Sequence, residues 1–360
     1  MRWRGALAVA TACAFAVVSW ASSAAAQFSP ELQKVIAAAK GEGQLSLIWS
    51  ATTLGGSAGA KRFEDGINKM FGTNIRITFT PGPSMPGVGN QLAAEKQAGR
   101  PASTDVYLAY SRTMALLHQY DLFELVDWQS LLPGRITDGN VEDKGALIKA
   151  VTALPGILYN TQLAPEKPAA LTDFLKPEWK GKIASTPYAA NFDILAAKDE
   201  WGPEKAIDFA KQLSPQLAGL IRCDAVDRVA TGEFLALVMT CTGNEAIAVQ
   251  AKGGPVAAVQ ARDLVFKSYF YFAVPRHSAN RNAAKLFIVY AMTPEGQKLM
   301  WETWQSDLDL FPGTHTAEAV AATEETYGGK LRNLDMAWQL ANLDDQQAWD
   351  EIVKIFTTRN

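Results

Sequence analysis

Residues 272–300 read FAVPRHSANRNAAKLFIVYAMTPEGQKLM, and this stretch decides how the chain is expected to fold. A short apolar strand at 272–275 runs into a helix whose apolar residues recur at helical spacing, with Asn282 as the predicted cap. A second helix is predicted to start with Thr293 as its cap and Pro294 at the first helical position, where a missing amide hydrogen costs nothing. The stretch therefore predicts a strand followed by two consecutive helices.

This stretch resembles the closing segment of the extracellular (periplasmic) solute-binding proteins of ABC importers, in the branch that includes ferric-ion binders. The shared pattern is NAAKLF followed by PEGQ, and Arg281 stands where the pattern usually has proline. A second shared pattern covers YNT at 159–161 and LTDFLKPEWKGKIA at 171–184. The resemblance implies an α/β fold with two lobes, each a mostly parallel sheet flanked by helices, joined by a two-strand hinge. It also implies a binding protein that has no cofactor.

The first 26 residues have the composition of a cleavable export signal. Two arginines precede an apolar core at 6–20, and the three alanines at 24–26 form a small-residue cleavage motif before Gln27. The core is shorter than the roughly 20 residues that a membrane-spanning helix needs. Cys13 lies in the middle of this core, a poor context for lipid attachment. We therefore expect a periplasmic protein whose signal peptide, 1–26, is removed.

Length and charge narrow the class of protein further. Removing the leader leaves 334 residues and takes the net charge from −3 to −5, because the leader holds two arginines. At ~100 to 200 residues per domain this length predicts two lobes. The mild acidity gives no reason to expect nucleic acid or anionic lipid as a partner, and we expect a monomer.

Alternating strands and helices define the expected lobes, since this pattern is typical of parallel sheets covered by helices. The predicted strands that precede helices or loops are 44–49, 74–80, 105–109, 182–185 and 234–240. The expected boundaries are 27–152 with 263–310 for lobe 1, 153–262 for lobe 2, and 311–360 for a helical tail that packs on lobe 2. Two extended crossovers between lobes make a hinge, the geometry for closure around a ligand.

Cys223 and Cys241 are the two cysteines that remain once the leader is removed. Because an oxidising compartment favours pairing, we predict a disulfide between them. The alternative is two buried thiols, since the sequence does not give the distance between the two Cα atoms.

Motifs for catalysis and for metal binding fail on inspection. The loop GGSAGAKR at 55–62 lacks the glycine before the lysine and the hydroxyl residue after it that a phosphate-binding loop needs, so we expect a flexible loop with Ser57 as a helix cap. The three histidines have no metal-ligand spacing, and no serine lies in a G-x-S-x-G elbow. We therefore expect no metal site and no enzyme.

Iron binding is also disfavoured. Ferric-ion binders of the resembled family carry adjacent tyrosines just after the strand that corresponds here to 234–240. At that place this chain reads CTGN, residues 241–244. The ligand is therefore not expected to be free ferric ion.

The remaining candidates are side chains in loops that follow strands, where open α/β sheets usually bind ligands. Trp49 and Tyr188 are alternatively core residues, and Arg112 is alternatively a surface partner of Glu95 or Asp121. The predicted ligand contacts are Trp49, Ser50, Thr52, Tyr110, Ser111, Arg112, Thr186, Tyr188, Asn191, Arg222, Thr240 and Thr242.

The sequence thus predicts the periplasmic substrate-binding component of an ABC importer, which captures a small solute between two lobes and delivers it to a membrane permease. Arg112 and Arg222, helix N-termini in the same loops and three aromatic side chains favour an organic anion with a flat portion. The acidic clusters that a polyamine site needs are missing from these loops. The alternatives are a ferric-ion or ferric-chelate binding protein and a periplasmic enzyme on the same scaffold.

Overall fold

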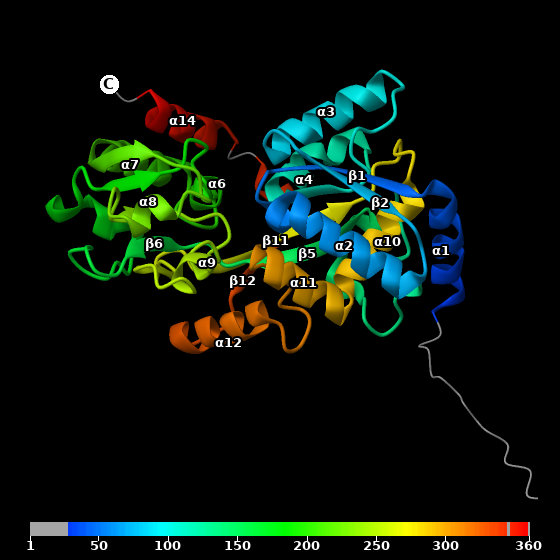
Figure 1. Ribbon diagram of the computed structural model, residues 1–360. Helices are drawn as coiled ribbons and strands as arrows, with labels where there is room; N and C mark the ends of the chain where they lie inside the picture. The colour runs from blue at the N-terminus through cyan, green and yellow to red at the C-terminus, as the bar shows by residue number, and fades with distance from the viewer. Residues whose placement is uncertain (1–27, 344–345, 359–360) are drawn as a thin grey trace, which may run out of the picture.

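The structure, a computed structural model, describes residues 28–343 and 346–358 and consists of two lobes that lie side by side (Figure 1). Each lobe has its own sheet and its own hydrophobic core. The predicted export signal at 1–26 lies outside the described residues. Within the described ranges, no helix combines the length and the apolar character needed to cross a bilayer.

Lobe 1 is built around β11, a strand that enters late in the chain. β11 pairs with β5 on one edge and with β12 and then β3 on the other, while β1 and β2 form a separate parallel pair. Asp105 links that pair to β3, because its carboxylate accepts the backbone N–H of Ser46 in β1. The strands are β1 (Gln44–Trp49), β2 (Arg76–Pro81), β3 (Tyr107–Tyr110), β4 (Val141–Glu142), β5 (Leu147–Ala153), β11 (Phe266–Ala273) and β12 (Arg332–Leu334).

The helices of lobe 1 pack around α10, whose residues from Leu286 to Met292 are all buried. α10 contacts both α1 and α2 (Figure 1). Its Phe287 ring meets the rings of Trp49, Phe63 and Phe272, so one aromatic side chain joins two helices and two strands. The helices are α1 (Pro30–Glu42), α2 (Gly56–Phe71), α3 (Met85–Gln97), α4 (Ser111–Leu117), α5 (Trp128–Leu131), α10 (Arg281–Met292) and α11 (Pro294–Trp304).

The predicted caps of α10 and α11 have different outcomes. Thr293 caps α11, since its hydroxyl accepts the N–H of Gly296 at 3.0 Å. The prediction that Asn282 caps α10 is wrong, because α10 begins earlier, at Arg281. The carboxylate of Glu42, at the end of α1, accepts the N–H groups of Asn282 and Ala283. A side chain from a distant helix therefore does the capping that was expected from a local one.

The PEGQ motif forms the corner between α10 and α11. A Cβ at Gly296 would lie 1.9 Å from the carbonyl oxygen of Tyr290, so this approach requires glycine. The Gln297 side chain donates to the carbonyl of Ala291 and accepts the N–H of Leu308, both at 2.8 Å. Gly296 and Gln297 of the motif thus each have a structural reason.

Lobe 2 has a sheet in the order β10-β6-β9-β7-β8. Strand β7 is parallel to β8 and β9, whereas β6 is antiparallel to its neighbours. β9 is much shorter than the predicted strand at 234–240, because Thr240 bonds to the hinge residue Gly156 instead. The elements are β6 (Ile157–Asn160), β7 (Ile183–Ser185), β8 (Leu217–Leu220), β9 (Ala236–Leu237), β10 (Val256–Val259), α6 (Phe192–Ala196), α7 (Pro203–Leu213), α8 (Asp227–Ala230) and α9 (Ile247–Gln250).

The C-terminal tail contacts both lobes. It comprises α12 (His315–Tyr327), β12, α13 (Met336–Ala341) and α14 (Gln346–Thr357). α13 packs on α4 of lobe 1, and α14 packs on α6 and α7 of lobe 2, where Phe356 meets Phe192 edge-on. Figure 1 shows α14 beside α7. The tail is therefore an interlobe element as well as a part of each core.

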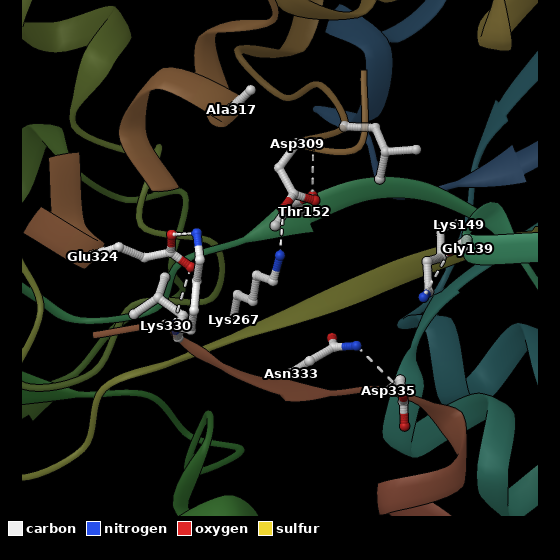
Figure 2. Close-up of polar contacts among 12 residues, drawn as sticks. Gly139, Lys149, Thr152, Lys267, Asp309, Ala317, Glu324, Lys330, Asn333 and Asp335 are labelled. Atoms are coloured by element: carbon white, nitrogen blue, oxygen red, sulfur yellow. Dashed lines mark hydrogen bonds and ion pairs between the residues drawn. The ribbon is translucent and has the colours of Figure 1, made fainter. Parts of the chain in front are cut away.

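The hinge consists of the connections β5 to β6 and β10 to β11, which touch each other. A Cβ at Gly156 would lie 2.2 Å from the carbonyl oxygen of Val259, so the two connections approach at backbone distance. Beside them, Lys267 of β11 pairs with Asp309 at 2.5 Å, and the hydroxyl of Thr152 in β5 donates to the same carboxylate at 2.7 Å (Figure 2). Both hinge strands are thus tied to the loop that follows α11.

Candidate functional site

Arg112, the second residue of α4 directly after β3, lies in a buried interlobe contact. The side chain is fully buried and donates to the carbonyl of Asn342 at 3.2 Å and to Gln346 Oε1 at 3.0 Å. Its guanidinium also lies 5.9 Å from the centroid of the Trp349 ring. Arg112 therefore holds the tail, and neither the expected ligand contact nor a surface ion pair describes its surroundings.

Tyr110 ends β3 and Ser111 begins α4, next to the interlobe contact of Arg112. Ser111 is almost fully buried as the first residue of α4. Burial raises the pKa of Tyr110, and the negative charge of Asp193 in lobe 2 raises that pKa further. Trp349 connects this end of β3 to lobe 2, because its ring lies 5.9 Å from the Arg112 guanidinium and its indole N–H donates to the carbonyl of Ala189. The phenol of Tyr110 is neutral at physiological pH.

The loop after β1 places its three predicted contacts differently. Trp49 belongs to the core of lobe 1, because only 3% of it is exposed and its indole N–H donates to the carbonyl of Val106. The prediction that it stacks on a ligand is wrong, and its core alternative is right. Ser50 shares a hydrogen bond with Thr53 at 2.7 Å, and Thr52 is exposed. Ser57 does not cap α2, since α2 begins at Gly56 after Gly55, a residue with positive φ.

In lobe 2, four predicted contacts form a hydrogen-bonded frame. The Thr186 hydroxyl accepts the N–H of Ala190 at 2.8 Å, and the Asn191 amide donates to the carbonyl of Thr240 at 2.7 Å. Thr240 is fully buried and accepts the N–H of Gly156. The carbonyl of Thr242 accepts the N–H of Leu154 in the hinge. The hydrogen bonds of these four residues therefore brace the loops of lobe 2 and the hinge.

Tyr188 joins this frame to the disulfide. Cys223 and Cys241 are bonded, with Cα atoms 5.9 Å apart, so the predicted disulfide is confirmed. The Tyr188 hydroxyl accepts the N–H of Cys223 at 3.1 Å and lies 3.6 Å from Cys241 Sγ. Burial raises the pKa of Tyr188 above its ordinary value. The disulfide thus connects the loops after β8 and β9, and Tyr188 packs against both.

Arg222, in the loop after β8, carries an exposed positive charge. Its side chain is 62% exposed and pairs with Asp224 at 3.2 Å. An ion pair with this exposure contributes little to stability, so the guanidinium is available to another anion.

Two carboxylates near the tyrosines were missed in the sequence. Asp193 lies in the first turn of α6, and Glu245 accepts the N–H groups of Cys241 and Thr242 at 2.8 and 2.7 Å. Burial raises the pKa of Glu245. Single acidic side chains are therefore present near these loops, one in α6 and one in the turn after β9. The TGNE turn at 242–245 was the available signal, because a carboxylate three residues after a threonine can accept the N–H groups of its own turn.

Ser278, a candidate nucleophile in the sequence, donates its hydrogen bond to a carboxylate and not to a histidine. The hydroxyl of Ser278, adjacent to His277 in the sequence, donates to Asp105 at 2.6 Å, within the strand network of lobe 1. Ser278 therefore has the role of a core hydrogen-bond donor.

Comparison with known proteins decides the family. The sequence profile described as "Bacterial extracellular solute-binding protein" matches residues 59–327. The chain belongs to this family. The Fe(3+)-binding periplasmic protein of Serratia marcescens is 31% identical over 150 residues, which is 41% of this chain and 42% of that protein. The chain is thus matched over less than half the length of this relative.

Solved structures of this family share the fold at low identity. The substrate-binding protein of an ABC transporter from Agrobacterium tumefaciens has a TM-score of 0.69 at 15% identity, covering 89% of this chain and 97% of that one. The periplasmic binding protein AfuA from Actinobacillus pleuropneumoniae, with fructose-6-phosphate bound, has a TM-score of 0.66 at 16% identity, covering 88% of this chain and all of that one. The two-lobed α/β solute-binding fold predicted from the sequence is confirmed. The expectation that each sheet is mostly parallel is wrong, because β11 is antiparallel to β3 and β5, and β6 is antiparallel to β9 and β10.

Proposed function

We propose that this protein is the substrate-binding component of an ABC importer and that it captures a small organic anion between its lobes for delivery to a membrane permease. The observation that carries the proposal is the link that Trp349 makes between two strand ends, one with Tyr110 in lobe 1 and one with Tyr188 in lobe 2. The Trp349 ring lies 5.9 Å from the guanidinium of Arg112, two residues after Tyr110, and its indole N–H donates to the carbonyl of Ala189, the residue after Tyr188. A solute held there touches both lobes, which is the requirement for ligand-driven closure.

The anionic character of the solute rests on Arg222. The guanidinium is exposed at a strand end, and its planar fork donates two parallel hydrogen bonds to a carboxylate or phosphate. Tyr188, beside the disulfide, offers a flat apolar face to the rest of the solute. Arg112 and Trp49 are not part of the proposed site, because Arg112 binds the C-terminal tail and Trp49 lies in the core of lobe 1.

A ligand screen tests the proposal. Purified protein is screened against carboxylates, sugar phosphates and amines by thermal shift and native mass spectrometry, and at ~100 times Kd linkage adds about 2.7 kcal/mol of stability. With the best anion, Arg222→Ala is expected to weaken binding at least tenfold, about 1.4 kcal/mol. Arg262→Ala removes the same charge from another exposed position of lobe 2 and is expected to change Kd less than twofold. Equal affinity of both variants and wild type would refute the anion site.

A second candidate solute is ferric ion or a ferric chelate. Tyr110, Tyr188, Asp193 and Glu245 are hard oxygen donors, and the Serratia relative binds Fe(3+). The raised pKa values of both tyrosines oppose this reading, because phenolate is the form that binds iron. A phenolate-to-iron absorption band after addition of ferric citrate would establish this candidate in place of the organic anion.

The protein is proposed to act as a monomer without a cofactor and without catalysis. One solute per chain, unchanged after incubation with the protein, is the expected result of native mass spectrometry. Appearance of a product would instead indicate a periplasmic enzyme on the same scaffold.

Export and the lobe boundaries are part of the proposal. We expect a mature protein that starts at Gln27, so an intact mass that includes earlier residues would contradict a cleaved signal at 1–26. Lobe 1 is proposed to comprise 27–152 and 263–310 and lobe 2 to comprise 153–262. Small-angle scattering with and without solute tests whether these units move as bodies.

A further inference from the structure

We propose that reduction of the Cys223–Cys241 disulfide creates, together with Glu245, a binding site for a thiophilic divalent cation of the zinc and cadmium class. The two sulfurs and one Glu245 oxygen all lie within 4.8 Å of one another. This inference goes beyond transport, because it involves neither the solute nor lobe 1. It requires a dithiol or phosphine reductant.

The spacing of the three donor atoms fits tetrahedral coordination. Zinc bonds of ~2.3 Å to sulfur and ~2.1 Å to oxygen place two sulfurs about 3.8 Å apart and a sulfur and an oxygen about 3.6 Å apart. The three atoms lie close enough for a cation to fit between them after the sulfurs separate. Three protein donors leave the fourth position for water, as in zinc sites with an open coordination position.

Glu245 is held in place for this role before any metal arrives. Its Oε1 accepts the N–H groups of Cys241 and Thr242, which fixes the carboxylate at the base of the loop that carries one sulfur. Its Oε2 is buried and has no hydrogen-bond partner among the described residues. A buried oxygen without a partner is costly unless it gains one, so this atom points to a ligand that the oxidised state does not supply.

Tyr188 fixes the sulfurs from the other side. Its hydroxyl accepts the N–H of Cys223 and lies 3.6 Å from Cys241 Sγ, so both cysteine positions are tied to one rigid side chain. The frame that surrounds the disulfide does not depend on the S–S bond alone. We therefore expect the loops after β8 and β9 to keep the two thiols near each other after reduction.

The chemistry balances with an external reductant. Two electrons and two protons from a dithiol break the S–S bond and give two thiols, while the dithiol is oxidised to its own disulfide. Cation binding then forms two metal–sulfur bonds and releases the two thiol protons to solvent, and Glu245 adds one metal–oxygen bond. In the oxidised chain neither sulfur is a thiolate, so the site exists in one redox state alone.

Cadmium is the probe for the test, because cadmium thiolates absorb in the ultraviolet. Protein reduced with a phosphine under argon is titrated with Cd²⁺ and compared with the oxidised protein, and far-ultraviolet circular dichroism and a melting curve are recorded for each. We expect one Cd²⁺ per reduced chain, a higher melting temperature of that chain with Cd²⁺, and no thiolate band from the oxidised chain. Absence of the band from folded reduced protein, or unfolding on reduction, would overturn the proposal.

Two variants separate a built site from two free thiols. Glu245→Gln keeps the size of the side chain and is expected to weaken Cd²⁺ binding by the reduced protein at least tenfold. Asp224→Asn removes a nearby exposed carboxylate that is outside the three-donor group, and a change of less than twofold is expected. If Glu245→Gln binds Cd²⁺ within twofold of wild type, the carboxylate is not a ligand and the proposed site is wrong.

Discussion

Arg112 and Arg222 stand at matching places in the two lobes, each two residues beyond the end of a strand, and their surroundings are opposite. Arg112 is fully buried and bonded to the C-terminal tail, whereas the side chain of Arg222 is 62% exposed. In lobe 1, the hydrogen-bond acceptors for Arg112 come from Asn342 and Gln346, more than 200 residues away in the sequence. In lobe 2, the loops after β8 and β9 are held together by the Cys223–Cys241 disulfide and by hydrogen bonds to nearby residues. Position after a strand therefore does not decide whether an arginine is buried or exposed.

The largest loss of stability is expected when Arg112, in lobe 1, is changed. Arg112→Ala removes a buried cation from acceptors that are themselves partly buried, so we expect a loss of about 3 to 5 kcal/mol in the free energy of unfolding. Urea unfolding followed by tryptophan fluorescence measures it. Arg76→Ala, at an exposed position of β2, is the control and should stay within about 0.5 kcal/mol. A loss as small as that of the control would mean that the tail contact is dispensable.

Removing the disulfide tests whether lobe 2 depends on its own cross-link. Replacing Cys223 and Cys241 together by serine opens a loop with a sequence separation of 18, and chain entropy predicts a loss of roughly 3 kcal/mol. We also expect weaker solute binding, because Arg222 precedes one of the linked cysteines. Melting curves of the double variant and of wild type measure the first effect. An unchanged melting temperature would show that the hydrogen-bonded frame suffices.

Asn191 offers a smaller effect with two separable causes. Asn191→Ala loses the bond to the Thr240 carbonyl and places alanine at φ 61°, for an expected cost of about 2 kcal/mol. Asn191→Gly loses the same bond and tolerates the backbone angle, so it should cost about 1 kcal/mol less. Chemical unfolding of both variants gives the difference. If glycine is no better than alanine, backbone conformation contributes nothing at this position.

The smallest effect on stability is expected for Arg222→Ala. An exposed ion pair contributes on the order of 0 to 1 kcal/mol, so the free energy of unfolding should move by less than about 0.5 kcal/mol. Differential scanning calorimetry of this variant beside Arg112→Ala completes the comparison. A loss of stability comparable to that of Arg112→Ala would make Arg222 a structural residue too.

Local patterns predicted much of the fold because their causes lie within a few residues. Thr293 and Pro294 start α11 as expected, and the pairing of Cys223 with Cys241 follows from compartment chemistry. Where the cause is distant, the prediction was wrong. Glu42, more than 200 residues away, replaces Asn282 as the cap of α10. The strand expected at 234–240 shortens because Thr240 bonds to the hinge.

The candidate site was less accessible to prediction for the same reason. Trp49 follows the alternation of its strand into the core, a reading that was open from the sequence, but nothing near Arg112 announces that the tail will cover it. Asp193 and Glu245 were missed because each looks like an ordinary helix or turn residue until the facing loops are placed. The sequence of one lobe does not show which of its residues will meet the other lobe.

Strand β11 also sets the order in which this chain can mature. The sheet of lobe 2 uses only strands between Ile157 and Val259, whereas β3 and β5 of lobe 1 pair with β11, which ends at Ala273. A chain that emerges from its N-terminus can therefore assemble the inserted sheet before it can close the sheet in which it began. Strands β3 and β5 must wait for this partner while more than 100 later residues appear, whereas β1 and β2 pair with each other. Such non-local pairing folds slowly, so the newly made protein spends its most vulnerable interval with the edges of lobe 1 unprotected.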